Sequence, residues 1–127
     1  MGLQIGSNFF FHSGRPINSL TVHPTDYQAS LYGAFSFFLP DDKPAGRGSM
    51  GTTPSIWGLD LMTKYDFQVG SINMNVRLDI FNIFDNSDTT EVDEFGEDAG
   101  GFINTNYLAT TRYQAPRRVR LGFGLVF

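Results

Sequence analysis

Four charged side chains carry the clearest chemical signal in this sequence: Arg77, Asp79, Arg118 and Arg120. They occupy the polar positions of two segments in which polar and apolar residues alternate. Guanidinium and carboxylate groups at such positions can pair across neighbouring strands, which fixes the register of the strands. We expect all four side chains to face water on one side of a sheet, as a structural ladder rather than as a substrate site.

Other residue types that could support catalysis or metal binding lack partners at motif spacing. His12 and His23 have no matched ligand or nucleophile near them in the sequence. No nucleophile elbow, P-loop or dinucleotide fingerprint is present. The absence of cysteine excludes thiolate metal sites, cysteine nucleophiles and disulfides. The sequence therefore predicts no enzymatic activity, no cofactor and no metal site.

Acidic residues crowd into one part of the chain, between positions 85 and 98. Their spacing fits no EF-hand loop, and Gly96 is misplaced for one. We therefore expect a solvated acidic loop rather than a calcium site. The net charge of −4 gives no electrostatic basis for a nucleic-acid partner.

The elements that must position these residues are strands, because alternation with a period of two dominates the chain. Strands are predicted near 3–12, 56–69, 72–84 and 117–127. Gly70 and Ser71 predict a tight hairpin turn between the middle two strands. Segment 28–39 is also apolar, but a fifth spanning strand would make the number of strands odd and place Met1 on the opposite side. It is expected to form a hairpin or extension within the first long connection.

The final segment has the most regular alternation. Counting back from the last residue, every second side chain is large and apolar, in the order Phe127, Leu125, Phe123, Leu121 and Val119. The length and pattern suit a transmembrane β-strand of about 9–11 residues, with apolar side chains facing lipid. On this interpretation Arg77, Asp79, Arg118 and Arg120 face the lumen of a barrel.

The lengths of the connections predict the topology. They alternate long (13–55), very short (70–71) and long (85–116), as in outer-membrane barrels with short periplasmic turns and longer outer loops.

Only 17% of the residues are charged, against about 25% in soluble domains. The sequence predicts an all-β fold over 1–127. It would be an antiparallel meander of about four long strands, one incomplete segment of a transmembrane β-barrel with two outer loops.

Four motifs follow one another in an order that resembles the C-terminal part of TonB-dependent outer-membrane receptors, particularly the Oar-like and SusC-like branches. They are Ser13-Gly14-Arg15-Pro16, the stretch from Gly51 to Asp60, Leu78-Asp79-Ile80-Phe81-Asn82-Ile83-Phe84-Asp85, and the stretch from Tyr113 to Gly122. Thr52 departs from the Gly-Arg-Thr-Pro pattern of the family. The alternating C-terminus is also similar to the assembly signal of outer-membrane barrel proteins.

The resemblance implies a wall segment of a transporter in the outer membrane of a Gram-negative bacterium. The parent would take up a bulky nutrient, or bind or export a ligand at the surface. Expected partners are outer-membrane lipid, the barrel-assembly machinery, and the remaining strands and plug of a longer parent, since the first residues contain no signal peptide. The alternative is a small soluble β-barrel or sandwich that binds an apolar ligand, which would need about eight strands.

Overall fold

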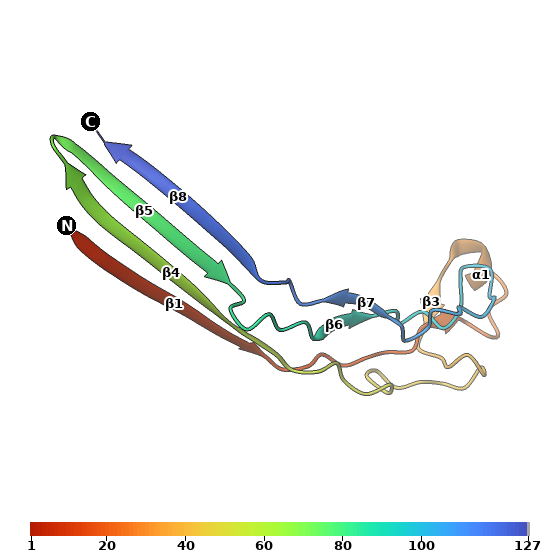
Figure 1. The fold of residues 1–127 in the computed structure, drawn as a ribbon. Coiled ribbons are helices and arrows are strands. Elements are labelled where there is room, and N and C mark those ends of the chain that lie inside the picture. Colours follow the sequence, from red (N-terminus) through yellow and green to blue (C-terminus); the bar gives the residue numbers. More distant parts are fainter. Residues whose placement is uncertain (127) are drawn as a thin grey trace. The chain divides into compact units, whose positions relative to one another are not determined.

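The computed structural model describes residues 1–126, leaving aside the side chain of Ser30. Four long antiparallel strands form one sheet in the order β1-β4-β5-β8 (Figure 1). Their bounds are Gly2–His12 for β1, Ile56–Val69 for β4, Ile72–Phe81 for β5 and Arg118–Val126 for β8. The predicted all-β antiparallel meander of four long strands is therefore confirmed.

The strand ends follow local backbone chemistry. The turn between β4 and β5 is made by Gly70 and Ser71, and Gly70 has a φ of 62°, a value that glycine adopts without strain. Strand β5 ends at Phe81, earlier than the predicted 84, because Asn82 adopts a φ of 51° that an extended strand does not allow.

Both termini of the sheet and its tight turn lie at one end, which we call the turn end (Figure 1). The register places Leu3 opposite Tyr65, and Asn73 opposite Val126, at this end. The two long connections leave from the opposite end, which we call the connection end. This is the alternation of short and long connections that the sequence predicts.

The register also separates the side chains into an apolar face and a polar face. Rows such as Thr63–Leu78–Leu121 and Tyr65–Val76–Phe123 run across the sheet on the apolar face. The polar face brings together the intervening residues, among them Lys64 opposite Arg77. Phe10 is an aromatic residue on the polar face. Its ring lies so close to Gly58 that a Cβ there would come within 2.6 Å of it.

The two long connections contain regular structure that the sequence analysis does not predict. The first holds β2 (Thr21–Val22) paired with β3 (Phe35–Ser36), and the helical turn α1 (Ala29–Tyr32). The second holds β6 (Thr89–Val92) paired with β7 (Thr110–Tyr113). Segment 28–39 lies within the first long connection and contributes α1 and β3, which pairs antiparallel with β2.

These connections also form a compact unit of their own. The sheet unit comprises Met1–His12, Ile56–Ser87 and Gln114–Phe127, and the second unit comprises Ser13–Ser55 and Asp88–Tyr113. Hydrogen bonds join the two connections. The amide of Leu20 donates to the carbonyl of Glu94, and the amide of Gly96 donates to the carbonyl of Leu20. The chain therefore folds as two units, where the sequence analysis treats 1–127 as one segment with two loops.

Candidate functional site: a two-faced sheet and its charged cluster

The apolar face of the sheet is open to its surroundings. In β8, Val119, Leu121, Phe123 and Leu125 are 64%, 58%, 73% and 54% exposed. Leu3, Ile5, Phe9 and Phe11 on β1 are exposed to a similar degree. In water such a continuous apolar surface would be unfavourable by about 25 cal/mol for each Å².

Aromatic side chains on this face gather in two belts. The belt at the connection end consists of Phe9, Phe11, Trp57 and Phe84, whose rings approach one another at 6.4 Å for Phe9–Trp57 and 5.4 Å for Trp57–Phe84. The belt at the turn end consists of Tyr65, Phe67 and Phe123, and the rings of Tyr65 and Phe67 stack at 5.8 Å. Two register rows without aromatic residues separate the belts: Ser7–Leu61–Ile80–Val119 and Ile5–Thr63–Leu78–Leu121.

The residues that the structure describes enclose almost no apolar interior. Among the residues that the structure describes, Ala29 is the one apolar residue classed as buried, at 3% exposure. Soluble domains of this length bury most of their large apolar side chains. The apolar face of the sheet therefore needs a covering that the described part of the chain does not supply.

The polar face holds a charged cluster centred on Asp79, whose side chain is fully buried. Arg77 donates from Nε to Asp79 Oδ1 at 2.8 Å. Arg120 donates from Nε and Nη2 to Asp79 Oδ2 at 2.9 and 2.6 Å. Asp79 lies opposite Arg120 in the register, so the cluster links β5 to β8.

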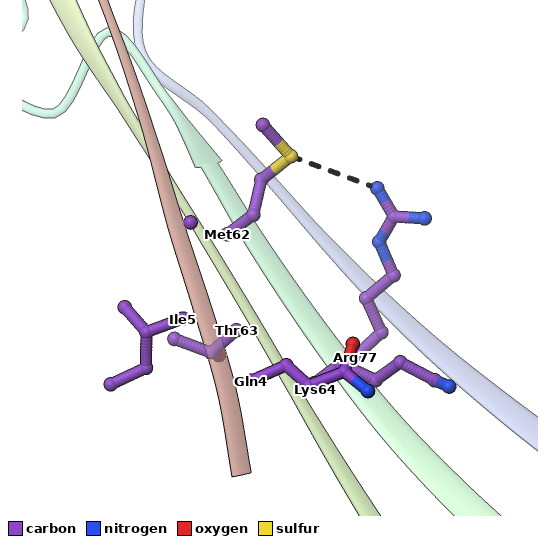
Figure 2. A pocket seen from close by; sticks show the side chains of 7 residues that line it. Gln4, Ile5, Met62, Thr63, Lys64 and Arg77 are labelled. Atoms are coloured by element: carbon purple, nitrogen blue, oxygen red, sulfur yellow. Dashed lines mark hydrogen bonds between the residues drawn. The ribbon is translucent and has the colours of Figure 1, made fainter.

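An open hollow of about 300 Å³ is lined by residues of β1, β4 and β5, among them Arg77 of this cluster (Figure 2). Its polar side chains come from Gln4, Thr63, Lys64 and Arg77, and Arg77 Nη2 approaches Met62 Sδ at 3.9 Å. These groups can hydrogen-bond to water or to a polar solute. They contain no pair of nucleophile and base.

A hydrogen-bonded cap closes the connection end of β5 and β8, and Asn82 is its centre. Asn82 is 5% exposed. Its Nδ2 donates to the carbonyls of Asn86 and Ala115 at 2.9 and 2.8 Å, and its Oδ1 accepts from the amide of Asn86. The amide of Asn82 donates to Asp60 Oδ1 at 2.9 Å. One side chain thus fixes both ends of the connection that follows β5.

Neighbouring residues complete this cap. Asp85 Oδ1 accepts from the amide of Arg117 at 2.8 Å. The carbonyl of Trp57 accepts from Gln114 Nε2 at 2.7 Å and from Asn86 Nδ2 at 3.1 Å. The Asn-Ile-Phe-Asp stretch and the stretch beginning at Tyr113 therefore meet in space.

The other two motifs meet in the second unit. Arg15 and Thr53 exchange hydrogen bonds, from the amide of Arg15 to Thr53 Oγ1 at 3.0 Å and from the amide of Thr53 to the carbonyl of Arg15 at 2.9 Å. Gly14 lies so close to this pair that an added Cβ would come within 1.7 Å of the Thr53 carbonyl oxygen. Only glycine fits at position 14.

The acidic stretch 85–98 is more ordered than the predicted solvated loop. Glu94 accepts from Arg15 Nη1 and from the amide of Asn18, both at 3.0 Å. Glu97 accepts from the amide of Val22 at 3.0 Å, and Asp98 accepts from the amides of Gly100 and Phe102. These carboxylates hold the backbone of the second unit together. No group of three or more His, Cys, Asp or Glu side chains among the described residues could hold a metal ion.

One exposed ion pair in this unit shifts the ionisation of its partners. A side-chain hydrogen bond from Lys43 to Asp41 lowers the pKa of Asp41 and raises the pKa of Lys43. The pair lies on the surface and does not form part of a catalytic arrangement.

The predicted site residues fall on two opposite faces. Arg77, Asp79, Arg118 and Arg120 share the polar face, and Val119, Leu121, Phe123 and Leu125 share the apolar face. Phe127, the last residue of the predicted assembly signal, lies outside the described residues.

Phe81 and Asn82 are two residues of the cluster and the cap that the sequence alone did not single out. Phe81 keeps the phase of Arg77 and Asp79 and pairs directly with Arg118. That phase was readable from the sequence. The role of Asn82 depends on Ala115, which is distant in the chain.

Comparisons of the chain with protein-family models, curated proteins and solved structures find no match. In the part of the chain that the structure describes, no helix is long and apolar enough to cross a membrane.

Proposed function

We propose that this chain is a C-terminal wall segment of an outer-membrane transporter of the TonB-dependent receptor type. Its sheet would separate lipid from an aqueous lumen. In the parent, the barrel would take up a bulky nutrient, or bind or export a ligand at the cell surface. The supporting observation is a single sheet with a continuous exposed apolar face and a charged, hydrogen-bonded opposite face.

The aromatic belts support a bilayer as the covering of the apolar face. Outer-membrane barrels carry an apolar band about 25 Å tall between two aromatic girdles. The stretch of β4 from Trp57 to Phe67 is about 34 Å long at about 3.4 Å per residue. A strand tilt of about 40° reduces this length to about 26 Å along the membrane normal. The belts are therefore spaced as the two interfaces of a bilayer require.

The free edges of the sheet support a larger parent. β1 and β8 each pair with a neighbour on one side only. Unpaired backbone groups are not tolerated in lipid, and barrels avoid them by closing. The remaining strands would have to come from the rest of a longer chain, with the barrel-assembly machinery joining them.

The soluble alternative has less support. A ligand-binding barrel or sandwich would turn the apolar rows inward around a core. Here those rows are exposed, and Ala29 is the one buried apolar residue in the described part of the chain.

The sole tryptophan, Trp57, permits a direct test with the full chain in detergent micelles. A spin-labelled fatty acid added to the micelle quenches tryptophans that touch its hydrocarbon region. Each of two double variants carries a single tryptophan at a new position: Trp57→Phe with Leu61→Trp, and Trp57→Phe with Met62→Trp. Positions 61 and 62 are adjacent in the chain and lie on opposite faces of the sheet. We expect several-fold stronger quenching for the substitution at Leu61.

Equal quenching at the two positions would contradict the proposal, because both faces would then have the same surroundings. Stronger quenching at Met62 would reverse the assignment of the faces. Trp57 itself should be quenched best by a label placed near the headgroups.

A further inference from the structure

The polar face of β5 and β8 carries an excess of positive charge that the wall function does not require. Arg77 and Arg120 both donate to Asp79, which uses both of its carboxylate oxygens. No carboxylate among the described residues pairs with Arg118. Its five N–H donors therefore remain available, as does Nη1 of Arg120.

Phe81 holds the two arginines side by side. The guanidinium carbons of Arg118 and Arg120 each lie 5.5 Å from the centre of the Phe81 ring. Cation–π attraction at this distance orients guanidinium groups while their N–H donors stay free. Phe81 is opposite Arg118 in the register, and the salt bridge to Asp79 fixes Arg120.

An open hollow of about 330 Å³ adjoins these groups, lined by Phe81, Arg118, Val119 and Arg120. Its volume is at the lower end for small-molecule sites. The hollow thus combines an aromatic surface, one unpaired guanidinium and one guanidinium held by a buried carboxylate.

We propose that Arg118, Arg120 and Phe81 form a binding subsite for an oxyanion, either a carboxylate or a phosphate group. Guanidinium groups match the geometry of both anions through two parallel hydrogen bonds. Arg118 supplies the main contact, Arg120 adds a second donor, and Asp79 is a positioning residue that orients Arg120. The subsite goes beyond the wall function, since it depends on β5 and β8 alone and not on what covers the apolar face.

The test is a titration of the full chain with inorganic phosphate, and separately with acetate, in uncharged detergent micelles. NMR signals of the arginine Nε–Hε groups and of the Phe81 amide report binding. Sodium chloride at matched ionic strength controls for screening. We expect saturable shifts at Arg118 and Arg120 with both anions.

Arg118→Gln should weaken phosphate binding by about tenfold or more, as expected for the loss of a charge-assisted contact. Arg118→Lys keeps the charge but not the planar fork, and should give an intermediate loss. Arg117→Gln is the matched control. It removes the same charge one residue away, and Arg117 does not line the hollow. It should bind phosphate like the unaltered chain.

Three outcomes would overturn the proposal: no saturable response in the unaltered chain, equal binding by Arg118→Gln, or an equal loss in Arg117→Gln. Adding phosphatidylglycerol to the micelles distinguishes the sources of the oxyanion. Competition with phosphate at Arg118 would support a lipid headgroup, and undisturbed phosphate binding would support a soluble anion. The comparison of tryptophan quenching at positions 61 and 62 does not enter this test, so the two proposals can fail separately.

Discussion

Asp79 illustrates how one carboxylate can organise a polar sheet face. It is fully buried, yet it accepts three hydrogen bonds from two arginines on two strands. Burial of a charge is tolerated only where partners and hydrogen bonds compensate for lost hydration. Removing this charge leaves Arg77 and Arg120 next to each other without compensation.

The Asp79→Asn variant should therefore lower the urea midpoint of the chain in detergent micelles, measured by circular dichroism. Asp66→Asn is the matched control, because Asp66 forms an ion pair with Lys64 at 2.8 Å and its side chain is 37% exposed. Exposed pairs contribute little to stability. The decrease for Asp79→Asn should be several-fold larger than the decrease for the control, and equal decreases would contradict the role of Asp79.

Asn82 combines a left-handed backbone with a buried hydrogen-bonded side chain, so two substitutions separate these contributions. Asn82→Gly loses the side-chain hydrogen bonds and should cost about 1–3 kcal/mol of unfolding free energy. Asn82→Ala also places a Cβ in the left-handed region, which adds roughly 1 kcal/mol. Urea unfolding in micelles measures both. An alanine variant as stable as the glycine variant would argue against backbone strain.

At the level of elements, the long connections owe their structure to contacts between segments that are distant in the chain. The motif around Gly14 pairs with the motif around Thr53, and Pro16 bridges to Thr52. Short strands such as β2 and β3 are too brief to be stable alone. They persist because loop carboxylates satisfy backbone donors nearby: Glu97 accepts from the amide of Val22 in β2 at 3.0 Å.

Gly14→Ala should separate the paired motifs, since the new Cβ would overlap the Thr53 carbonyl oxygen. We expect several-fold faster cleavage within 13–55 during limited proteolysis, because local opening exposes the backbone. Gly46→Ala serves as the control, because nothing lies within 4 Å of the Cβ it would add. Similar cleavage rates in the two variants would contradict the close approach at Gly14.

At the scale of the whole molecule, the balance between surface and interior is unlike that of a soluble domain. The chain has 13 phenylalanines but one buried apolar residue in its described part, Ala29. Exposed apolar patches beyond a few hundred Å² mark surfaces that bind lipid or protein, or cause aggregation. The two open sheet edges add a second route to association.

The full chain should therefore aggregate in aqueous buffer and become dispersed in detergent micelles. Analytical ultracentrifugation in both media measures this difference. A soluble, monodisperse product that melts cooperatively in plain buffer would contradict the membrane proposal, because its apolar rows would then need an interior of their own.

Alternation in the sequence was enough to determine the four long strands and the separation of Val119 or Leu121 from Arg118 or Arg120. The reason is geometric: successive side chains of a strand point to opposite faces, so a period of two specifies both the strand and its faces. The tight turn at Gly70 and the two long connections then set the order of the strands.

Only the tertiary structure determined the short elements of the second unit, the cap around Asn82 and the pairing of Gly14 with Thr53. These features depend on partners far along the chain, such as Ala115 for Asn82, and no local periodicity encodes which partner is met. The same holds for the position of Phe81 between Arg118 and Arg120. Local chemistry specifies strands, whereas contacts between distant segments are decided when their hydrogen bonds and packing form together.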